Sequence, residues 1–378
     1  MEDLKRFVGT EILADIGKQK VLMLYGSRRV GKTNILDDIK ARYGEKALYV
    51  TGEDLDVQSI FKNRTIKNYK LFVGNYKIII IDEAQYIPEI GLCLKLMIDQ
   101  IKGITIIASG SSSFDLSNAT GEPLVGRNYT FRLYPFAQQE LKQIENLLDT
   151  KGNFEERMIY GYYPELVYLK TKQEKERYLQ EIVNSYLLKD ILALENVKDA
   201  SFLKKLLQLL AFQVGSEVST NELANTLGIS QKTVDRYLDL LTNVFIIYPL
   251  TAYNTNQRKE IVKSKKWYFS DNGLRNALIK NYNVLGFRND VGALWEQYCL
   301  NERIKFNQYK KRDVQNYFWR TYDGQEIDFI EIEGDKMEAF ECKFSKDKIK
   351  TPAAFAKFYP NVPVTVLHKN NYLEYIME

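Results

Sequence analysis

The stretch VLMLYGSRRVGKTNILDDI, residues 21–39, decides the fold expected for the first third of the chain. Its start, VLML, has the length of a buried parallel strand, and apolar residues recur at helical spacing near its end. Between them the pattern G-x-x-x-x-G-K-[ST] is matched at Gly26, Gly31, Lys32 and Thr33. Strand, glycine loop and helix in this order predict a phosphate-binding loop, because the glycines let the backbone wrap its N–H groups around an anion.

The predicted phosphate site extends over the whole loop. We expect Lys32 to contact the outer phosphates of a nucleotide and the Thr33 hydroxyl to bind Mg²⁺. The start of the following helix adds a partial positive charge at the same place. The residues expected to hold the nucleotide are Gly26, Ser27, Arg28, Arg29, Val30, Gly31, Lys32 and Thr33.

A second apolar strand supports the nucleotide site. The stretch KIIIIDEAQYIP, residues 77–88, is a run of four isoleucines that ends in Asp82 and Glu83. Ligands of open parallel sheets collect at such strand ends, where Asp82 can hold the metal through water and Glu83 can orient the attacking water. A third strand, ITIIA, ends in SGSSS, where Ser109 and Ser111 are positioned to sense the terminal phosphate. The alternative is that both strand ends are merely solvated tips.

The composition limits the classes of function. A chain of 378 residues has room for two or three domains, and 45% hydrophobic with 27% charged residues predicts a globular protein. We find no run of eighteen apolar residues that predicts a membrane span, and the N-terminus MEDLKRFVGT does not resemble a secretory signal. We therefore expect a cytoplasmic protein without a membrane partner. The net charge of +4 is compatible with nucleic acid but no argument for it.

The cysteines and the single histidine narrow the chemistry. Odd in number and without paired spacing, the cysteines predict neither a disulfide framework nor a zinc site. One histidine argues against histidine-based triads and multi-histidine metal sites. Any chemistry should rest on carboxylates, lysines and arginines. The residues concerned are Cys93, Cys299, Cys342 and His368.

Four stretches in fixed order, GSRRVGKT, IIIIDEAQ, ASGSSS and LVGRNYTFRLYPF, resemble AAA-type ATPases of bacteria and archaea that carry a C-terminal domain of unknown function. The likeness extends over nearly the whole chain. It implies an ATP-binding core with an extra strand between the strands of the two motifs. Arg127 matches an arginine of the family pattern, which implies contact with a γ-phosphate in cis or from a neighbouring subunit. The alternative is a surface or structural arginine.

The middle of the chain is predicted to be helical. It is followed by a pattern typical of a helix-turn-helix module. The helices after Gln138 fit either a lid that closes over nucleotide or a rigid spacer. Residues 219–250 predict a helix-turn-helix followed by a strand, with Ser219 and Glu222 at capping-box spacing and Ser230 before the second helix. DNA reading and protein contact stay open, because the outward face mixes charges of both signs. That face comprises Gln231, Lys232, Asp235, Arg236 and Asp239.

The last third contains three acids and a lysine. Glu296 lies in a predicted helix, Asp328 lies in the middle of an apolar strand, and Glu341 and Lys343 share one face of the next strand. A carboxylate inside an apolar strand is costly unless it is paired or binds a metal. Helix Glu, strand Asp and Glu-x-Lys resemble the PD-(D/E)XK nuclease core.

This second resemblance implies a role for each of the four residues. Asp328 and Glu341 would ligate Mg²⁺, Glu296 would complete the metal shell, and Lys343 would activate water or steady the phosphoryl charge. The proline of the namesake motif is absent before the aspartate. A retained fold without activity and an ordinary mixed sheet with surface ion pairs are the alternatives.

These observations predict a multidomain α/β protein. We expect an AAA-type P-loop ATPase core at 1–138, a helical lid or linker at 139–200, a winged helix at 201–262 and a nuclease-like α/β domain at 263–378. The leading hypothesis is an ATP-binding, Mg²⁺-dependent ATPase coupled to DNA binding or cleavage. The alternative is a nucleotide-operated switch or scaffold, in which an inactive nuclease fold binds a protein partner. Oligomerisation with further copies of the chain is a possible control in either case.

Overall fold

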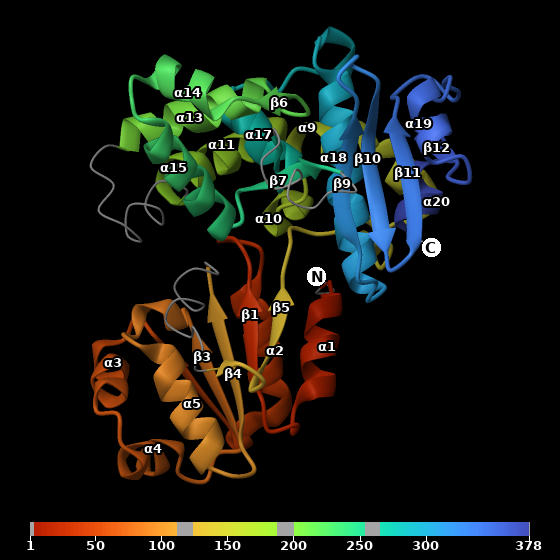
Figure 1. Cartoon of the computed structure of the whole chain (residues 1–378). Coiled ribbons are helices and arrows are strands. Elements are labelled where there is room, and N and C mark those ends of the chain that lie inside the picture. Colours follow the sequence, from red (N-terminus) through yellow and green to blue (C-terminus); the bar gives the residue numbers. More distant parts are fainter. Residues whose placement is uncertain (1–3, 112–123, 187–199, 254–264, 378) are drawn as a thin grey trace. The chain divides into compact units, whose positions relative to one another are not determined.

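The computed structural model of the chain divides into two compact units (Figure 1). The first contains Met1–Tyr134 together with Asn243–Phe245, and the second contains Pro135–Thr242 and Ile246–Glu378. The structure describes residues 4–111, 124–186, 200–253 and 265–377. The expected boundary at 200/201 lies within the second unit, and the one at 262/263 lies outside the described residues.

The first unit is built on a parallel sheet of five strands in the order β2-β3-β4-β1-β5. Because β4 lies between β1 and β3, the extra strand expected between the two motifs is confirmed. The strands are β1 Val21–Tyr25, β2 Ala47–Thr51, β3 Ile78–Asp82, β4 Thr105–Gly110 and β5 Asn128–Arg132. The helices are α1 Phe7–Asp15, α2 Lys32–Tyr43, α3 Leu55–Lys62, α4 Ile66–Val73 and α5 Ile90–Gln100, with short 3₁₀ turns at Gly44–Lys46 and Ala84–Tyr86.

The central strands of this sheet are buried along their whole length. Every residue of β1, β3 and β4 is buried, which is why their sequences are runs of apolar residues rather than alternations. Ile79 and Ile81 of β3 pack in one core cluster with Met23 of β1 and Leu94 of α5. Burying each such side chain stabilises the unit by about 1.5–3 kcal/mol. This packing fixes the positions of the polar residues at the carboxyl ends of these strands.

The second unit contains a mixed sheet of seven strands in the order β12-β11-β10-β9-β7-β8-β6. The pairs β7/β9 and β11/β12 are parallel, and the remaining neighbours are antiparallel. The sheet thus runs without a break through the predicted winged helix and the predicted nuclease-like domain. The strands are β6 Glu217–Val218, β7 Ile247–Ala252, β8 Lys265–Phe269, β9 Gln315–Arg320, β10 Glu326–Glu333, β11 Lys336–Cys342 and β12 Val364–Leu367.

Helices α14 and α15 lie in the stretch that is predicted to form the helix-turn-helix. The Ser219 hydroxyl accepts the N–H of Glu222 at 3.3 Å, and Ser230 accepts that of Thr233 at 3.2 Å. The helices of the unit are α7 Gln138–Leu141, α8 Leu147–Gly152, α9 Phe154–Tyr160, α10 Pro164–Tyr168, α11 Lys172–Glu181, α13 Ala200–Phe212, α14 Thr220–Leu227, α15 Gln231–Asn243, α17 Asn272–Leu278, α18 Val291–Tyr309, α19 Ala353–Phe358 and α20 Tyr372–Ile376. A π-helical turn occupies Ile182–Tyr186 and a 3₁₀ turn Leu285–Phe287.

A buried ion pair on α18 fastens the start of the second unit. Lys305 and Glu302 lie 2.7 Å apart and are both almost fully buried. The Lys305 ammonium donates to the carbonyl of Phe136 at 2.9 Å, and the Glu302 carboxylate accepts the N–H of Gln138 at 2.7 Å. The segment YPF at 134–136, expected within the first domain, therefore ends in contact with the last third of the chain.

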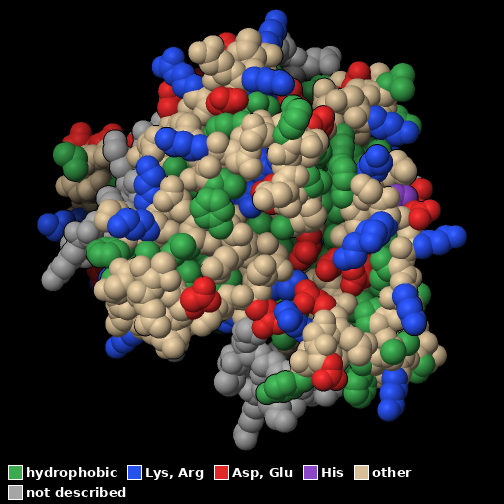
Figure 2. Space-filling view, turned by 90° about the horizontal axis from the view of Figure 1, so that it is seen from above, with side chains coloured by type: hydrophobic (Ala, Val, Ile, Leu, Met, Phe, Trp, Pro, Cys, Tyr) green, Lys and Arg blue, Asp and Glu red, His purple; other side chains and the backbone are tan. Residues whose placement is uncertain are grey.

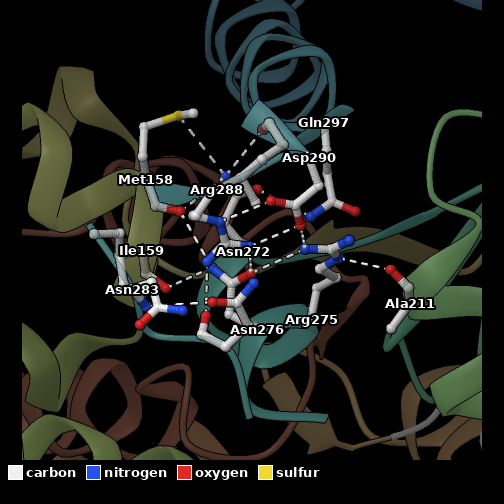
Figure 3. Close-up of polar contacts among 12 residues, drawn as sticks. Met158, Ile159, Ala211, Asn272, Arg275, Asn276, Asn283, Arg288, Asp290 and Gln297 are labelled. Carbon is white, nitrogen blue, oxygen red and sulfur yellow. Dashed lines mark hydrogen bonds and ion pairs between the residues drawn. The ribbon is translucent and has the colours of Figure 1, made fainter. Parts of the chain in front are cut away.

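A polar network joins four helices of the second unit (Figure 3). The Asp290 carboxylate, just before α18, accepts hydrogen bonds from Arg275 of α17 and from Arg288. Arg275 also donates to the carbonyl of Ala211 on α13 at 2.7 Å, and Asn276 donates to the carbonyl of Ile159 on α9 at 2.7 Å. Burial alone would raise the pKa of Asp290, but the two guanidinium groups outweigh it and lower that pKa to about 2.

We predict that Asp290→Asn destabilises the second unit by about 3 kcal/mol, because two buried guanidinium groups lose their counter-ion. The loss lies at the low end of the range for buried ion pairs, because the Asp290 side chain keeps 19% of its surface exposed. Chemical unfolding followed by tryptophan fluorescence measures this unit, because all three tryptophans, Trp267, Trp295 and Trp319, lie in it. Asp323→Asn, at an exposed turn, is the control.

The same variant has a pH signature. With its pKa lowered in the folded state, the Asp290 carboxylate contributes stability that is present above the unfolded pKa of about 4 and is lost as the pH falls toward 2. The wild type should lose this increment over that range, and Asp290→Asn should not. Equal slopes for the two proteins would contradict the assignment.

Candidate functional site

The phosphate loop connects β1 to α2 in a conformation that requires glycine. Gly31 has φ +95°, in the left-handed region, and so does Arg29 with φ +67°. A Cβ on Gly26 would lie 2.4 Å from the carbonyl oxygen of Leu133, so no larger residue fits there. The loop is therefore formed as the sequence predicts, with its backbone turned around the start of a helix.

Lys32 and Thr33 lie where the loop meets the acidic strand end. The buried Lys32 ammonium donates to the carbonyls of Gly26 and Ser27 at 2.8 and 3.2 Å. The Thr33 hydroxyl donates to the Asp82 carboxylate at 2.9 Å. Residues from two separate motifs, one on α2 and one on β3, are thus brought together by the sheet.

The Asp82 carboxylate connects several polar groups at the carboxyl ends of the strands. It accepts hydrogen bonds from the hydroxyl of Ser109, from the hydroxyl of Tyr49 at 2.9 Å and from the N–H of Glu83 at 3.1 Å. Ser109 was expected at this place, but Tyr49 of β2 was not. Nothing in the sequence around Tyr49 marks it, because only the pairing of β2 with β3 brings its side chain to Asp82.

Glu83 and Ser111 are joined through Gln85. Glu83 has φ +48°, which turns the chain sharply after β3. The Gln85 amide donates to the Glu83 carboxylate at 2.5 Å and to the Ser111 hydroxyl at 3.3 Å. The two residues expected to orient water and sense a phosphate therefore share one amide, which sequence reasoning had not singled out.

Arg6 holds the loop from outside its motif. This buried side chain donates to the carbonyl of Val30 at 2.7 Å and to that of Tyr134 at 2.6 Å. Arg28 of the loop donates to the hydroxyl of Tyr86 at 2.9 Å, beside the acidic strand end. Arg6 precedes α1 and carried no signal in the sequence, since its partners are backbone carbonyls of distant segments.

Arg127 lies at the amino ends of the strands, opposite to the phosphate loop. In the parallel pair of β1 and β5, Val21 is beside Asn128, whereas Tyr25, next to the loop, is beside Arg132. Arg127 is thus separated from the phosphate loop by the length of β1, about 13 Å. Its guanidinium forms an ion pair with Asp99 at 2.7 Å. The position does not fit action in cis, and action from a neighbouring subunit stays a prediction.

The acids of the last third form a second polar site on β10 and β11. The β10/β11 register pairs Phe329 with Phe340, and Asp328 and Glu341 are the neighbouring residues on the two strands. The Lys343 ammonium lies 2.7 Å from the Glu341 carboxylate and 3.3 Å from that of Asp328. Asp328 also accepts the N–H of Cys342 at 2.7 Å. The structure thus brings Asp328, Glu341 and Lys343 together.

A β-bulge in β10 adjoins this site. On the side of β9, Ile327 pairs with Trp319 and Ile330 with Tyr317, so two residues of β10 oppose one of β9. The two are Asp328 and Phe329. Bulges re-aim side chains and recur beside functional sites, and this one lies at the carboxylate that an apolar strand would not otherwise contain.

Glu296 of α18 is held by residues that sequence reasoning missed. The Tyr268 hydroxyl donates to its carboxylate at 2.5 Å, and the Lys266 ammonium lies 3.4 Å away. Lys266 is almost fully buried and also pairs with Glu326. Lys266 carries no signal in the sequence that marks it as part of this site. In the described part of the chain, no group of three or more His, Cys, Asp and Glu has an arrangement that could hold a metal ion.

The acids of this site repel one another. Burial, then the charge of Asp328, raises the pKa of Glu341 well above its ordinary value, and the same two causes raise the pKa of Glu296. Lys343 and Lys266 supply only part of the compensating charge. A further cation or a proton at this site would therefore be favourable, because it would reduce the repulsion between the carboxylates.

Three family models match successive parts of the chain. Residues 18–142 match a model described as an AAA domain. Residues 151–285 and 291–375 match models described as domains of unknown function (DUF8612 and DUF4143). The AAA match and the loop geometry make the N-terminal part an AAA-type P-loop ATPase fold, which implies nucleotide binding, as the sequence predicted.

Relatives of the chain are also described as uncharacterized. One from Mycobacterium tuberculosis is 25% identical over 346 residues, covering 90% of this chain and 74% of the relative. One from Haemophilus influenzae is 27% identical over 341 residues, covering 84% and 80%. A solved structure, the RuvB Holliday junction branch migration motor of Thermotoga maritima, aligns with a TM-score of 0.36 at 16% identity over 68% of this chain and 95% of that one. A score this low implies nothing about activity.

A helix that crosses a membrane must be both long and apolar. Within the described ranges, no helix has both the length and the apolar character that crossing a membrane demands.

We predict that the second unit loses stability as the pH rises from about 4.5 to about 7, because the folded state holds the proton of Glu341 more tightly than the unfolded chain does. Glu341→Gln should remove about 2 kcal/mol of that loss. Urea unfolding at the two ends of this pH range, with a chelator present and followed by tryptophan fluorescence, measures it. Glu374→Gln, exposed on α20, is the control, and an unchanged slope in Glu341→Gln would contradict the prediction.

Proposed function

We propose that the protein is an ATP-binding, Mg²⁺-dependent ATPase whose second unit binds or cleaves DNA. The observation that carries the ATPase part is the 2.9 Å hydrogen bond from the Thr33 hydroxyl to the Asp82 carboxylate. It joins the phosphate loop to the acidic strand end, and a P-loop ATPase uses such a pair at its metal.

The residues at this edge fit Mg²⁺ and a nucleotide. Thr33 and Asp82 offer the oxygen ligands that Mg²⁺ prefers, and the cradle at Gly26 is too narrow for any Cβ. The metal would neutralise the charge that develops on the phosphates. Lys32 binds the outer phosphates, Glu83 orients the attacking water, and Ser109 and Ser111 sense the terminal phosphate. Arg127 acts on the nucleotide of a neighbouring copy of the chain.

We predict that Lys32→Ala lowers the affinity for ATP about 10- to 100-fold, because the outer phosphates lose a charge-assisted hydrogen bond. Titration with a fluorescent ATP analogue in the presence of Mg²⁺ measures the change. Lys67→Ala, exposed on α4, removes the same charge away from the loop and should bind like the wild type. Undiminished binding by a folded Lys32→Ala protein would rule out this role for Lys32.

The arrangement around α14 and α15 supports a winged helix. The elements follow as α13, β6, α14, α15, β7 and β8, and β8 lies between β6 and β7 in the sheet. Such a module can place its second helix in the major groove. On the face drawn in Figure 2, however, basic and acidic side chains are interspersed, whereas phosphate binding favours uncompensated Lys and Arg.

The arrangement around β10 and β11 supports a nuclease-like domain. Helix α18 precedes the antiparallel strands β9, β10 and β11, and α19 leads to β12, which is parallel to β11. Asp328 and Glu341 offer carboxylate oxygens on adjacent strands and lack part of their compensating charge, which fits a divalent cation. A metal there would stabilise charge on a phosphodiester. Lys343 would then activate water beside it.

We predict Mg²⁺- or Mn²⁺-dependent cleavage of plasmid or single-stranded DNA that falls about 100-fold or more in Glu341→Ala and in Lys343→Ala, because each removes a group that would touch the reacting phosphate or water. The assay is run with and without ATP, and Glu374→Ala is the control. Wild-type protein that never cleaves, or cleavage that survives in Glu341→Ala, would reject the nuclease.

A switch or scaffold is the second candidate. The observation that favours it is the engagement of Glu296 by Lys266 and Tyr268, which leaves Asp328 and Glu341 as the carboxylates available to a metal. A lysine in that place can stabilise the fold without catalysis. In this case ATP would change the conformation of the chain, and the last domain would bind a protein partner.

A further inference from the structure

The positive charge of the chain is concentrated in one stretch of the second unit. Residues 343–369, the basic segment, contain six lysines and one acid, Asp347. Their net charge of +5 exceeds the +4 of the whole chain, so the other residues together carry a slight negative charge. Basic residues gathered in one place are the electrostatic footprint of a surface that binds anions. The lysines are Lys343, Lys346, Lys348, Lys350, Lys357 and Lys369.

The fold places both ends of the basic segment beside the acid site. The segment begins at the end of β11 and continues through α19 and β12 at one edge of the sheet (Figure 1). The N–H of Lys343 donates to the carbonyl of Leu367 at 3.0 Å, and the N–H of Lys369 donates to the carbonyl of Phe344 at 3.5 Å. Both ends therefore lie next to the strand end that carries Glu341.

The lysines between these ends are available to a ligand. Lys346, Lys348, Lys350 and Lys357 are exposed, and none of them forms an ion pair with another residue in the described part of the chain. Lys346 follows Lys343 by three residues, so their Cα atoms lie at most about 11 Å apart. Uncompensated lysines bind a nucleic acid favourably, because each phosphate that they neutralise releases a counter-ion from the backbone.

The acid site makes such a basic neighbourhood necessary for a nucleic acid. The carboxylates of Asp328 and Glu341 repel a phosphate, and Lys343 supplies only part of the compensating charge. Further lysines beside the site would offset this repulsion and raise the local concentration of a polyanion. The outward face of α15 mixes charges of both signs and offers no comparable excess.

We propose that the basic segment binds the phosphate backbone of DNA and guides a strand to the acid site. This inference rests on the proposed function of the second unit as a unit that binds DNA, and it assigns the binding to residues 343–369 instead of α15. Lysines contact phosphates as point charges, and such contacts carry no sequence information. Binding should therefore tolerate any DNA sequence and weaken steeply as the salt concentration rises.

The test compares three double variants of the full chain, each of which loses two positive charges. Fluorescence anisotropy of a short labelled DNA duplex measures their affinities over a series of salt concentrations, with a chelator present so that binding is separated from cleavage. The variants are Lys346→Ala/Lys348→Ala in the basic segment, Lys232→Ala/Arg236→Ala on α15, and the control Lys62→Ala/Lys67→Ala on α3 and α4 of the first unit.

Lys346→Ala/Lys348→Ala should bind the duplex about tenfold more weakly than the wild type at low salt. The slope of log K against log salt concentration should also become shallower by about two, since each phosphate contact contributes about 0.9 to it. The other two variants should bind like the wild type. All six side chains are exposed, so the melting temperatures should not change.

Three outcomes overturn the inference in different ways. Equal slopes for the wild type and Lys346→Ala/Lys348→Ala, or a loss of affinity confined to Lys232→Ala/Arg236→Ala, would refute it while leaving DNA binding by the second unit in place. Wild-type protein with no affinity for the duplex would refute the proposed DNA function as well. Binding to vesicles that contain phosphatidylserine, weakened in Lys346→Ala/Lys348→Ala and not competed by DNA, would identify a membrane surface instead.

Discussion

The second unit depends on a constraint set by α18, a helix that buries polar side chains on most of its circumference. Each of these groups needs a partner, because an unpaired polar group inside the protein is costly. Gln297 exchanges hydrogen bonds with the backbone of β8 and with α17. Arg303 pairs with Glu331 of β10, and Asn301 donates to the carbonyl of Phe269. A helix of this kind fixes the positions of the elements around it more narrowly than an apolar helix would.

The candidate acid site inherits its placement from this helix. Glu296 lies on α18 among the buried groups, and Trp295, next to it, donates to the carbonyl of Leu367 on β12 at 3.0 Å. The position of the Glu296 carboxylate is therefore fixed by α18, because neighbouring residues of this helix form hydrogen bonds to distant strands of the sheet. In the first unit the corresponding constraint is local, since one carboxylate, Asp82, accepts hydrogen bonds from side chains of two strands and a helix. The two sites thus differ in how widely their support is spread.

What the sequence could predict follows from how local each signal is. Lys32, Thr33 and Asp82 stand in contiguous patterns that end buried strands, so their meeting follows from a parallel sheet. Tyr49 and Lys266 reach their sites only through pairings with distant strands, and their own neighbourhoods carry no pattern. The continuous seven-stranded sheet was missed for the same reason. Its join, the parallel pairing of β7 with β9, involves residues more than sixty positions apart and no turn between them.

The extra residue in the β10 bulge determines which side chains of this strand face the acid site. Side chains of a strand alternate between faces, so removing one residue from the bulge would restore regular pairing with β9 and turn the rest of the strand by one place. Deleting Phe329, for example, would keep the Asp328 carboxylate, but the residues on one side of the bulge would then turn to the opposite face of the sheet. The acidic site therefore depends on one extra residue in β10 as well as on the side chains that the strand carries.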